Sequence, residues 1–257
     1  MVSDYVAFWK EDGHRVVNVF GTRKFVAADL VILHVNLSVV PQEFVDFSAR
    51  YPMVINGGVT DIRKSAFSRN VIKRDDEYTG KVIVKSDLNY FGLPEWRSRP
   101  VGRRILQSLG LGGKKWKPVE YQIYDRVADV PTEAFDDPHL VVEKFIPEVG
   151  DGLYSIRTHV FFGNNVTSYR LRSKSQVIKF RNVVDFYQVD TNPDVVDIAR
   201  QMDVDFGKID YVVHDGQPFV LDINKTPSSS GRAVRSSARI VANQRFRAEG
   251  LYAYFDG

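Results

Sequence analysis

The chain has 257 residues, of which 44% are hydrophobic, so it is long enough for one large domain or for two to three smaller ones. Its net charge of +3 is a small excess of 35 basic over 32 acidic residues, and composition alone favours neither nucleic acid nor a membrane as a partner. The absence of cysteine excludes disulfides, thiolate metal sites and a cysteine nucleophile, and it fits a cytoplasmic location. No apolar run approaches the roughly 20 residues of a membrane span, and no signal peptide is visible.

Residues 1–60 predict a small parallel α/β domain. The apolar run at 28–35 is typical of a parallel strand buried on both faces, and Pro41 marks the start of the helix that follows it. We expect this domain to be shortened, because a doubly wound domain normally has a strand before its first helix. The predicted segments are helices at 4–11 and 41–50 and strands at 15–20, 28–35 and 53–56.

Residues 61–145 predict a second unit with a basic insert at about 90–118. The insert combines glycines, prolines and many basic residues with one short amphipathic helix, which favours a mobile segment. The other predicted segments are helices at 60–72 and 130–135 and strands at 81–88, 121–125 and 140–146.

Residues 146–257 predict longer strands joined by tight turns. Gly163 and Asp215-Gly216 are strong hairpin signals. The predicted segments are strands at 155–163, 164–173, 206–214 and 218–225 and helices at 193–202 and 233–245.

Three oxygen-bearing side chains lie on the last predicted hairpin. Asp222 and Asn224 are two residues apart on one strand, so they face the same side, and Asp210 can lie across from them on the neighbouring strand. Three oxygen ligands on one face suit Mg²⁺, with Mn²⁺ as an alternative. The competing interpretation is a solvated hairpin face on which these residues only cap turns.

This block resembles the metal-binding end of the ATP-grasp enzymes, in particular the branch of the ribosomal-protein glutamate ligase and the glutathione synthetases. In that branch an Asp on one strand is followed, across a turn, by an acid-x-Asn-x-x-Pro motif, which here is Asp210 followed by Asp222, Asn224 and Pro227. The usual acid is Glu, and Asp222 is shorter by one methylene. The resemblance implies an ATP-grasp fold of α/β (α+β) class, in which two α+β lobes at 61–145 and 146–257 hold ATP between them.

Further segments follow the order of that family. By resemblance, Lys85 in KVIVKSD neutralises the nucleotide phosphates, and Lys64, or Arg63 beside it, is the earlier basic residue of the small lobe. The basic insert, with GLGGKKWK, stands where the family has a glycine-rich flap.

The segment LVVEKFIPE resembles the strand that joins the two lobes. The resemblance assigns Glu143 to the adenine amino group and Glu148 to the ribose. It assigns the backbone of three residues to the purine edge: Lys144, Phe145 and Ile146. The competing interpretation is a core strand with exposed acids.

Arginines of the next hairpin resemble those that face the phosphates and the acyl acceptor in the family. The candidates are Arg157 and Arg172, with Arg170 as the alternative. They would stabilise the transferring phosphoryl group.

The resemblance implies an ATP-dependent ligase that joins a small carboxylate, amino acid or peptide to an amine or thiol through an acyl-phosphate. The alternatives are a kinase of the same fold acting on a small hydroxyl substrate, which the basic insert would suit, and a non-catalytic nucleotide-binding module. RNA binding rests only on the basic insert with Trp96 and Trp116 and is disfavoured. A homo-oligomer stays open, and the sequence does not name the substrates.

Overall fold

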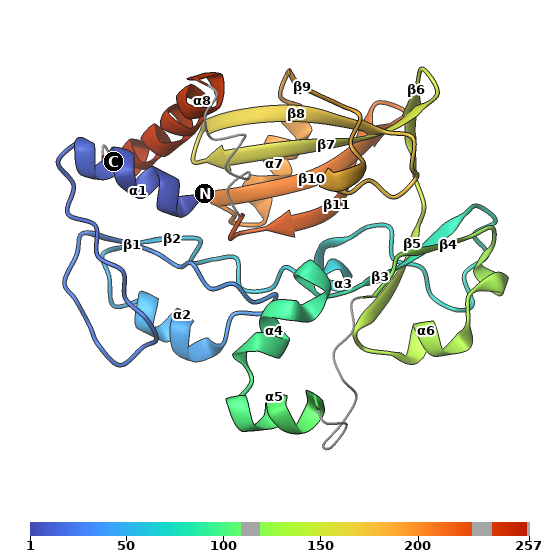
Figure 1. The fold of residues 1–257 in the computed structure, drawn as a ribbon, viewed down its shortest axis with the longest axis horizontal. Coiled ribbons are helices and arrows are strands. Elements are labelled where there is room, and N and C mark those ends of the chain that lie inside the picture. The colour runs from blue at the N-terminus through green and yellow to red at the C-terminus, as the bar shows by residue number, and fades with distance from the viewer. Residues whose placement is uncertain (109–118, 228–237, 256–257) are drawn as a thin grey trace.

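The computed structural model describes residues 1–108, 119–227 and 238–255, drawn as a ribbon in Figure 1. The α-helices are α1 (Val2–Glu11), α2 (Gln42–Ser48), α3 (Lys64–Phe67), α4 (Leu93–Ser98), α5 (Val101–Ser108), α6 (Thr132–Asp136), α7 (Pro193–Gln201) and α8 (Ala238–Ala248). The strands are β1 (Leu30–Ile32), β2 (Met53–Ile55), β3 (Val82–Ser86), β4 (Gln122–Tyr124), β5 (Leu140–Lys144), β6 (Glu148–Gly150), β7 (Leu153–Phe162), β8 (Asn165–Ser173), β9 (Asp185–Val189), β10 (Phe206–His214) and β11 (Gln217–Asn224). Short 3-10 helices are η1 (Asn89–Gly92), η2 (Val127–Asp129), η3 (Phe180–Asn182) and η4 (Glu249–Tyr254).

The N-terminal segment contains the predicted parallel strand pair. β1 and β2 run parallel with Leu30 opposite Met53, and the helices predicted at 4–11 and 41–50 are confirmed as α1 and α2. The strand predicted at 15–20 is wrong, since these residues adopt no regular structure. They find no partner strand, because β1 pairs only with β2 among the described residues.

Helix α1 packs beside α8, and its buried side chains lie in a cluster shared with Ile55 of β2 and with residues of the large sheet (Figure 1). Its Tyr5 and Trp9 are buried in one aromatic cluster with Phe162 of β7 and Phe206 of β10. The indole N–H of Trp9 donates to the Ala248 carbonyl at 2.8 Å. The first helix of the chain therefore contributes to the core of the C-terminal part.

The small sheet has the order β4-β3-β5 and is antiparallel. All five residues of β3 are buried. The helix predicted at 60–72 is wrong at both ends, because only Lys64–Phe67 is helical. The Ile72 N–H donates to the Val142 carbonyl at 2.8 Å, so the end of that segment is extended and lies along β5.

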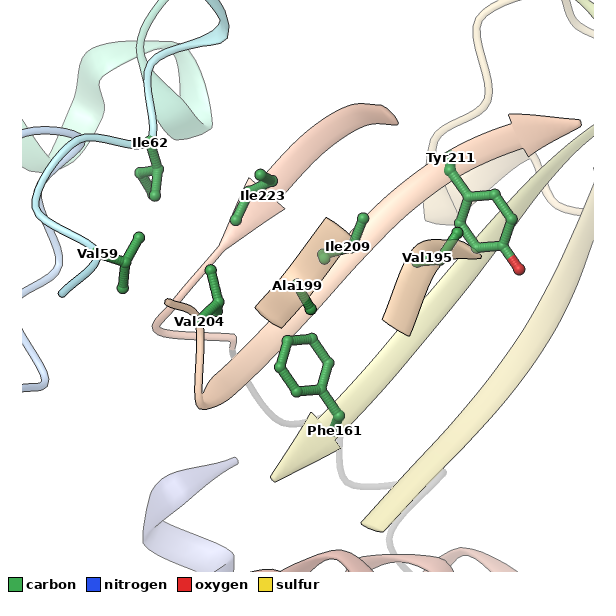
Figure 2. Close-up of a cluster of buried hydrophobic side chains, with 9 residues drawn as sticks. All are labelled: Val59, Ile62, Phe161, Val195, Ala199, Val204, Ile209, Tyr211 and Ile223. Carbon is green, nitrogen blue, oxygen red and sulfur yellow. The ribbon is translucent and has the colours of Figure 1, made fainter. Parts of the chain in front are cut away.

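The large sheet is antiparallel, with the order β11-β10-β7-β8-β9 and β6 paired to β7. Both predicted hairpins are confirmed: β7 and β8 turn at Gly163, with φ of 54°, and β10 and β11 turn at Asp215 and Gly216, with φ of 50° and 76°. Positive φ at both turn positions is the geometry that an Asp-Gly pair favours. Helix α7 covers one face of this sheet and packs on the cluster in Figure 2.

The predicted C-terminal helix is confirmed as α8 from residue 238 onward, and its predicted start at 233–237 lies outside the described residues. The GLGGKKWK segment also lies outside them. In the described part of the insert, α4 and α5 take the place of the single helix expected. No helix among the described residues is long and apolar enough to span a bilayer.

Asn56 fastens the end of β2 to the start of β10. Its Oδ1 accepts from the backbone N–H groups of Asp205 and Phe206 at 2.9 and 3.0 Å, and its Nδ2 donates to the Phe206 carbonyl at 2.8 Å. Its own N–H donates to the Asp205 carboxylate at 2.6 Å. Asn56 has φ of 60°, a left-handed conformation that asparagine tolerates better than most residues.

Candidate functional site

The three oxygen-bearing residues of the last hairpin lie where the sequence predicts. Asp210 is directly opposite Asp222, and Asn224 is opposite Lys208, so all of these positions share one face of the β10–β11 pair. Two carboxylates and an amide are hard oxygen donors, which suit Mg²⁺. Their role as metal ligands stays a prediction, and the described residues contain no cluster of three or more His, Cys, Asp or Glu side chains.

Each of the two carboxylates is paired with a lysine. Lys64 Nζ lies 2.9 Å from Asp222 Oδ1, and Lys208 Nζ lies 2.6 Å from Asp210 Oδ2. Thr158 Oγ1 also donates to Asp210, at 2.7 Å. Two ammonium groups of the described residues therefore lie beside the proposed metal ligands.

Burial and pairing oppose each other at both lysines. Burial lowers the pKa of Lys64 and of Lys208, but the carboxylate beside each one outweighs burial, so both pKa values are raised above the usual value. Lys64 is only 2% exposed. Both lysines therefore remain charged at neutral pH, and they balance the negative charge of the hairpin.

A second buried ion pair lies on the small sheet. Lys85 of β3 pairs with Glu143 of β5, and its ammonium also donates to the Leu221 carbonyl of β11 at 3.3 Å. Lys85 and Glu143 are 5% and 2% exposed. Since Leu221 directly precedes Asp222, Lys85 reaches across to the hairpin that carries the proposed metal ligands.

One of the two carboxylate oxygens of Glu143 has no hydrogen-bond partner among the described residues. Oε2 pairs with Lys85, whereas Oε1 is buried and has no hydrogen-bond partner among the described residues. A buried acceptor without a donor is costly, so this oxygen suits a ligand that carries an N–H group. The assignment of Glu143 to an adenine amino group agrees with this chemistry and stays a prediction.

The backbone of the connecting strand is partly occupied. The Lys144 N–H donates to the Asn70 carbonyl and the Phe145 N–H to the Lys81 carbonyl, both at 2.8 Å. Among the described residues, Ile146 makes no such backbone hydrogen bond. Of the three predicted backbone groups, the N–H of Ile146 is therefore the donor that remains for a ligand.

The predicted ribose ligand, Glu148, is held by arginines. Arg157 donates to both of its oxygens, with the shortest contact at 2.9 Å, and Arg170 Nη2 lies 2.9 Å from Oε1. The Val213 N–H also donates to it, at 2.8 Å. The structure thus brings Glu148, Arg157 and Arg170 together in one closed cluster.

This arginine cluster lies on the other face of the large sheet from the proposed metal ligands. On β7, Thr158 is opposite Asp210 and the preceding Arg157 is opposite Tyr211, and successive side chains of a strand point to opposite faces. Arg170 is opposite Arg157 and shares its face. The roles predicted for these arginines stay predictions.

Two further basic candidates lie apart from the hairpin carboxylates. Arg172 pairs with Asp185 and Asp151, each at 3.0 Å. Arg63 pairs with Asp61 at 2.6 Å. Of the two basic residues considered near the start of the small lobe, it is therefore Lys64 that reaches the metal-ligand positions.

Sequence reasoning missed Lys208 and Tyr121. Lys208 is two residues before Asp210 on one strand, and this period-two spacing would have placed both on the same face. Burial raises the pKa of Tyr121 to about 12 and Lys64 opposes it, while the charges of Asp222 and Glu143 raise it further. No local pattern marks Tyr121, which precedes β4 and comes to the site only through the fold.

No family model matches the sequence, and no curated protein matches it. A RimK-domain ATP-grasp protein from Sphaerobacter thermophilus has a similar structure, with 13% identity, a TM-score of 0.50 and coverage of 97% of this chain and 94% of that chain. The macrocyclase MdnC of Microcystis aeruginosa, bound with precursor peptide MdnA, has 14% identity, a TM-score of 0.39 and coverage of 69% of this chain and 49% of its own.

A RiPP-associated ATP-grasp ligase from Chryseobacterium gregarium, in complex with ADP and a leader and core peptide, has 13% identity, a TM-score of 0.40 and coverage of 68% and 49%. The match thus spans about half the length of this ligase and of the macrocyclase. The match to the RimK-domain protein extends over nearly the whole of both chains and includes the small and the large sheet. The chain has the ATP-grasp fold.

Proposed function

We propose that this chain is a Mg-ATP-dependent ligase that joins a carboxylate to an amine. The observation that carries this proposal is the pair of Lys64 and Asp222, which places a buried ammonium group of α3 on the one carboxylate of β11. With Lys85 reaching Leu221 from β3, two lysines converge on the hairpin from outside the large sheet. Converging positive charge beside hard oxygen ligands suits the phosphates of a nucleotide and its metal ion.

The roles divide between the two sheets. Lys64 and Lys85 would bind phosphate oxygens, and Glu143 Oε1 would accept from the adenine amino group. Asp210, Asp222 and Asn224 would hold Mg²⁺, which when bound neutralises phosphate charge. The ammonium groups of Lys64 and Lys208 would then be available to phosphate oxygens, which would keep the charge of the site balanced.

The reaction follows from phosphoryl transfer. A carboxylate oxygen attacks the γ-phosphorus, and the bond from phosphorus to the ADP oxygen breaks. The amine nitrogen then attacks the acyl carbon, forming a C–N bond; the C–O bond to phosphate breaks, and the nitrogen loses a proton to solvent. The protein supplies position and charge rather than a covalent nucleophile.

Product analysis tests this proposal. The protein is incubated with ATP, Mg²⁺ and mixtures of carboxylates and amines, and ADP release is measured together with the mass of the products. The ligase predicts ADP, phosphate and an amide, each lost in Asp222→Asn. Asp215→Asn is the matched control, since Asp215 lies at the exposed turn of the same hairpin. A phosphorylated product without an amide would instead identify a kinase.

A second candidate is a nucleotide-binding module without catalysis. It is favoured by one observation, namely that both hairpin carboxylates are already neutralised by lysines. This candidate predicts ATP binding that is unchanged by Mg²⁺ and no ADP release with any substrate mixture. Mg²⁺-dependent ATP binding, measured by calorimetry, would exclude it.

A further inference from the structure

A cavity of about 400 Å³ lies between the loop after β1 and the segment formed by η1 and α4. Leu37, Leu93 and Pro94 give it an apolar lining, and Tyr90 adds an aromatic ring. Arg97 is the charged residue in the lining, and the Asn36 amide is a further polar group there. This volume is within the range of small-molecule sites, which combine an apolar lining with a few polar groups.

The two walls of the cavity are joined by hydrogen bonds. The Ser38 N–H donates to Glu95 Oε1 at 2.7 Å, and the Asn89 N–H donates to Ser38 Oγ at 2.9 Å. Ser38 is fully buried. These hydrogen bonds hold the two walls of the cavity together.

The cavity is connected to the proposed metal ligands through Thr226. Thr226 Oγ1 lies 2.9 Å from Asn36 Oδ1, and the Thr226 N–H donates to Asn224 Oδ1, also at 2.9 Å. Asn36 in the cavity lining is thus two hydrogen bonds from Asn224. A ligand group beside Asn36 would lie close to the place where the acyl-phosphate forms.

Backbone strain is concentrated at the same cavity. Tyr90 and Phe91 have φ of 46° and 59°, and Gly92 follows with 71°. Two non-glycine residues in the left-handed region cost free energy, and such strain is commonly kept at functional sites. Here it presents the Tyr90 ring, which is 65% exposed, at the cavity.

The polar groups of the cavity have complementary chemistry. Arg97 is exposed and forms no ion pair with any described residue, so its guanidinium is available to an anion. Asn36 Oδ1 is an acceptor that can take a second donor besides Thr226. One ligand could use all three features. Its cationic group would donate to Asn36, its anionic group would pair with Arg97 and its apolar part would pack on the leucines.

We propose that this cavity binds the amine acceptor, and that the acceptor is a free amino acid with an apolar side chain. Its ammonium group lies at Asn36 Oδ1, its carboxylate pairs with Arg97 and its side chain packs on Leu37 and Leu93. This inference rests on the proposed function, because the bound amino acid is an acceptor only if the chain forms an acyl-phosphate. The amino group would then face that acyl-phosphate.

Calorimetric titration with L-leucine, in the presence of a non-hydrolysable ATP analogue and Mg²⁺, tests the site. L-leucinamide, which lacks the carboxylate, should bind at least tenfold more weakly. In the series from alanine to norvaline, each added methylene should raise affinity about fourfold. L-glutamate should bind more weakly than leucine.

Arg97→Ala should weaken leucine binding at least tenfold. Arg103→Ala is the matched control, since it removes an exposed arginine of the same basic segment outside the cavity and should leave affinity unchanged. Equal effects of the two variants, or equal binding of leucine and leucinamide, would overturn the proposal.

Nucleotide titrations separate this inference from the proposed function. Arg97→Ala should retain the nucleotide affinity of the parent chain. Leucine binding without any ADP release would leave the site standing and remove the ligase function. ADP release and an amide product without leucine binding would overturn the site and keep the ligase.

Discussion

Lys64 and Asp222 form an ion pair in which only one partner is fully buried. Lys64 Nζ is 2.9 Å from Asp222 Oδ1, and the side chains are 2% and 27% exposed. Loss of Asp222 leaves a buried ammonium group, whereas loss of Lys64 leaves a carboxylate that water still reaches. The two partners should therefore contribute unequally to stability.

Asp222→Asn should lower the free energy of unfolding by about 2 to 4 kcal/mol, because it leaves Lys64 buried without its partner. Lys64→Met should cost less. In the double variant, the loss should be smaller than the sum of the two single losses. Urea denaturation of the four proteins measures this cycle, and strictly additive losses would contradict it.

Mg²⁺ should stabilise the protein only together with a nucleotide. Without phosphates, the ammonium groups of Lys64 and Lys208 already pair with the carboxylates that would hold the metal. With ATP and Mg²⁺ at about a hundred times the dissociation constant, stability should rise by about 2.7 kcal/mol. Thermal denaturation with Mg²⁺, ATP, both and EDTA measures this. A clear shift with Mg²⁺ alone would show that the lysines do not exclude the metal.

Stability should fall as pH decreases from 6.5 to 4, in part because of His159. Burial lowers the pKa of this histidine to about 4 from 6.5. In that window the unfolded chain binds a proton that the folded chain does not. Over the whole window this lowers the free energy of unfolding by about 3 kcal/mol. Above pH 6.5 both states are neutral and the effect is absent.

His159→Gln should flatten the slope of unfolding free energy against pH between 4.5 and 6.5, measured in urea. His139→Gln is the control, since it removes an exposed histidine in place of the buried one. An unaltered slope in His159→Gln would mean that the histidine titrates normally in the folded chain.

Asn56→Ala should destabilise the protein more than Asn56→Gly. Both variants remove hydrogen bonds to Asp205 and Phe206, which should cost about 2 to 3 kcal/mol. Alanine adds about 1 kcal/mol more, because φ of 60° is unfavourable for it and free for glycine. Chemical denaturation measures the free energy of unfolding of both variants. Equal losses would show that the positive φ at residue 56 costs alanine nothing relative to glycine.

The sequence predicted the structure best where the local pattern and the tertiary contacts agree. The two hairpins of the large sheet follow from Gly163 and Asp215-Gly216, and the facing of Asp210 and Asp222 follows from strand periodicity. The prediction of a helix at 60–72 was wrong because residues 70–72 are extended and pair with β5. This pairing is a long-range contact, which local helix propensity does not reveal.

Side-chain partners were harder to predict than positions. The lysine on each hairpin carboxylate comes from a different place, Lys208 from the same strand and Lys64 from α3. Only the Lys208 pair can be predicted from the sequence, from its spacing of two residues from Asp210. The engagement of Glu148 by Arg157 and Arg170 depends on the register of β6, β7 and β8, which composition and turn signals do not fix.

The hydrogen bonds of Asn56 have a mechanical consequence. They hold the end of β2 on β10, and the aromatic contacts of α1 attach the N-terminus to the same sheet. Residues 56–81 lead from β2 to the small sheet, and residues 145–147 lead from it to β6. The ion pair of Lys64 and Asp222 links α3, which precedes the small sheet in the chain, to β11 of the large sheet.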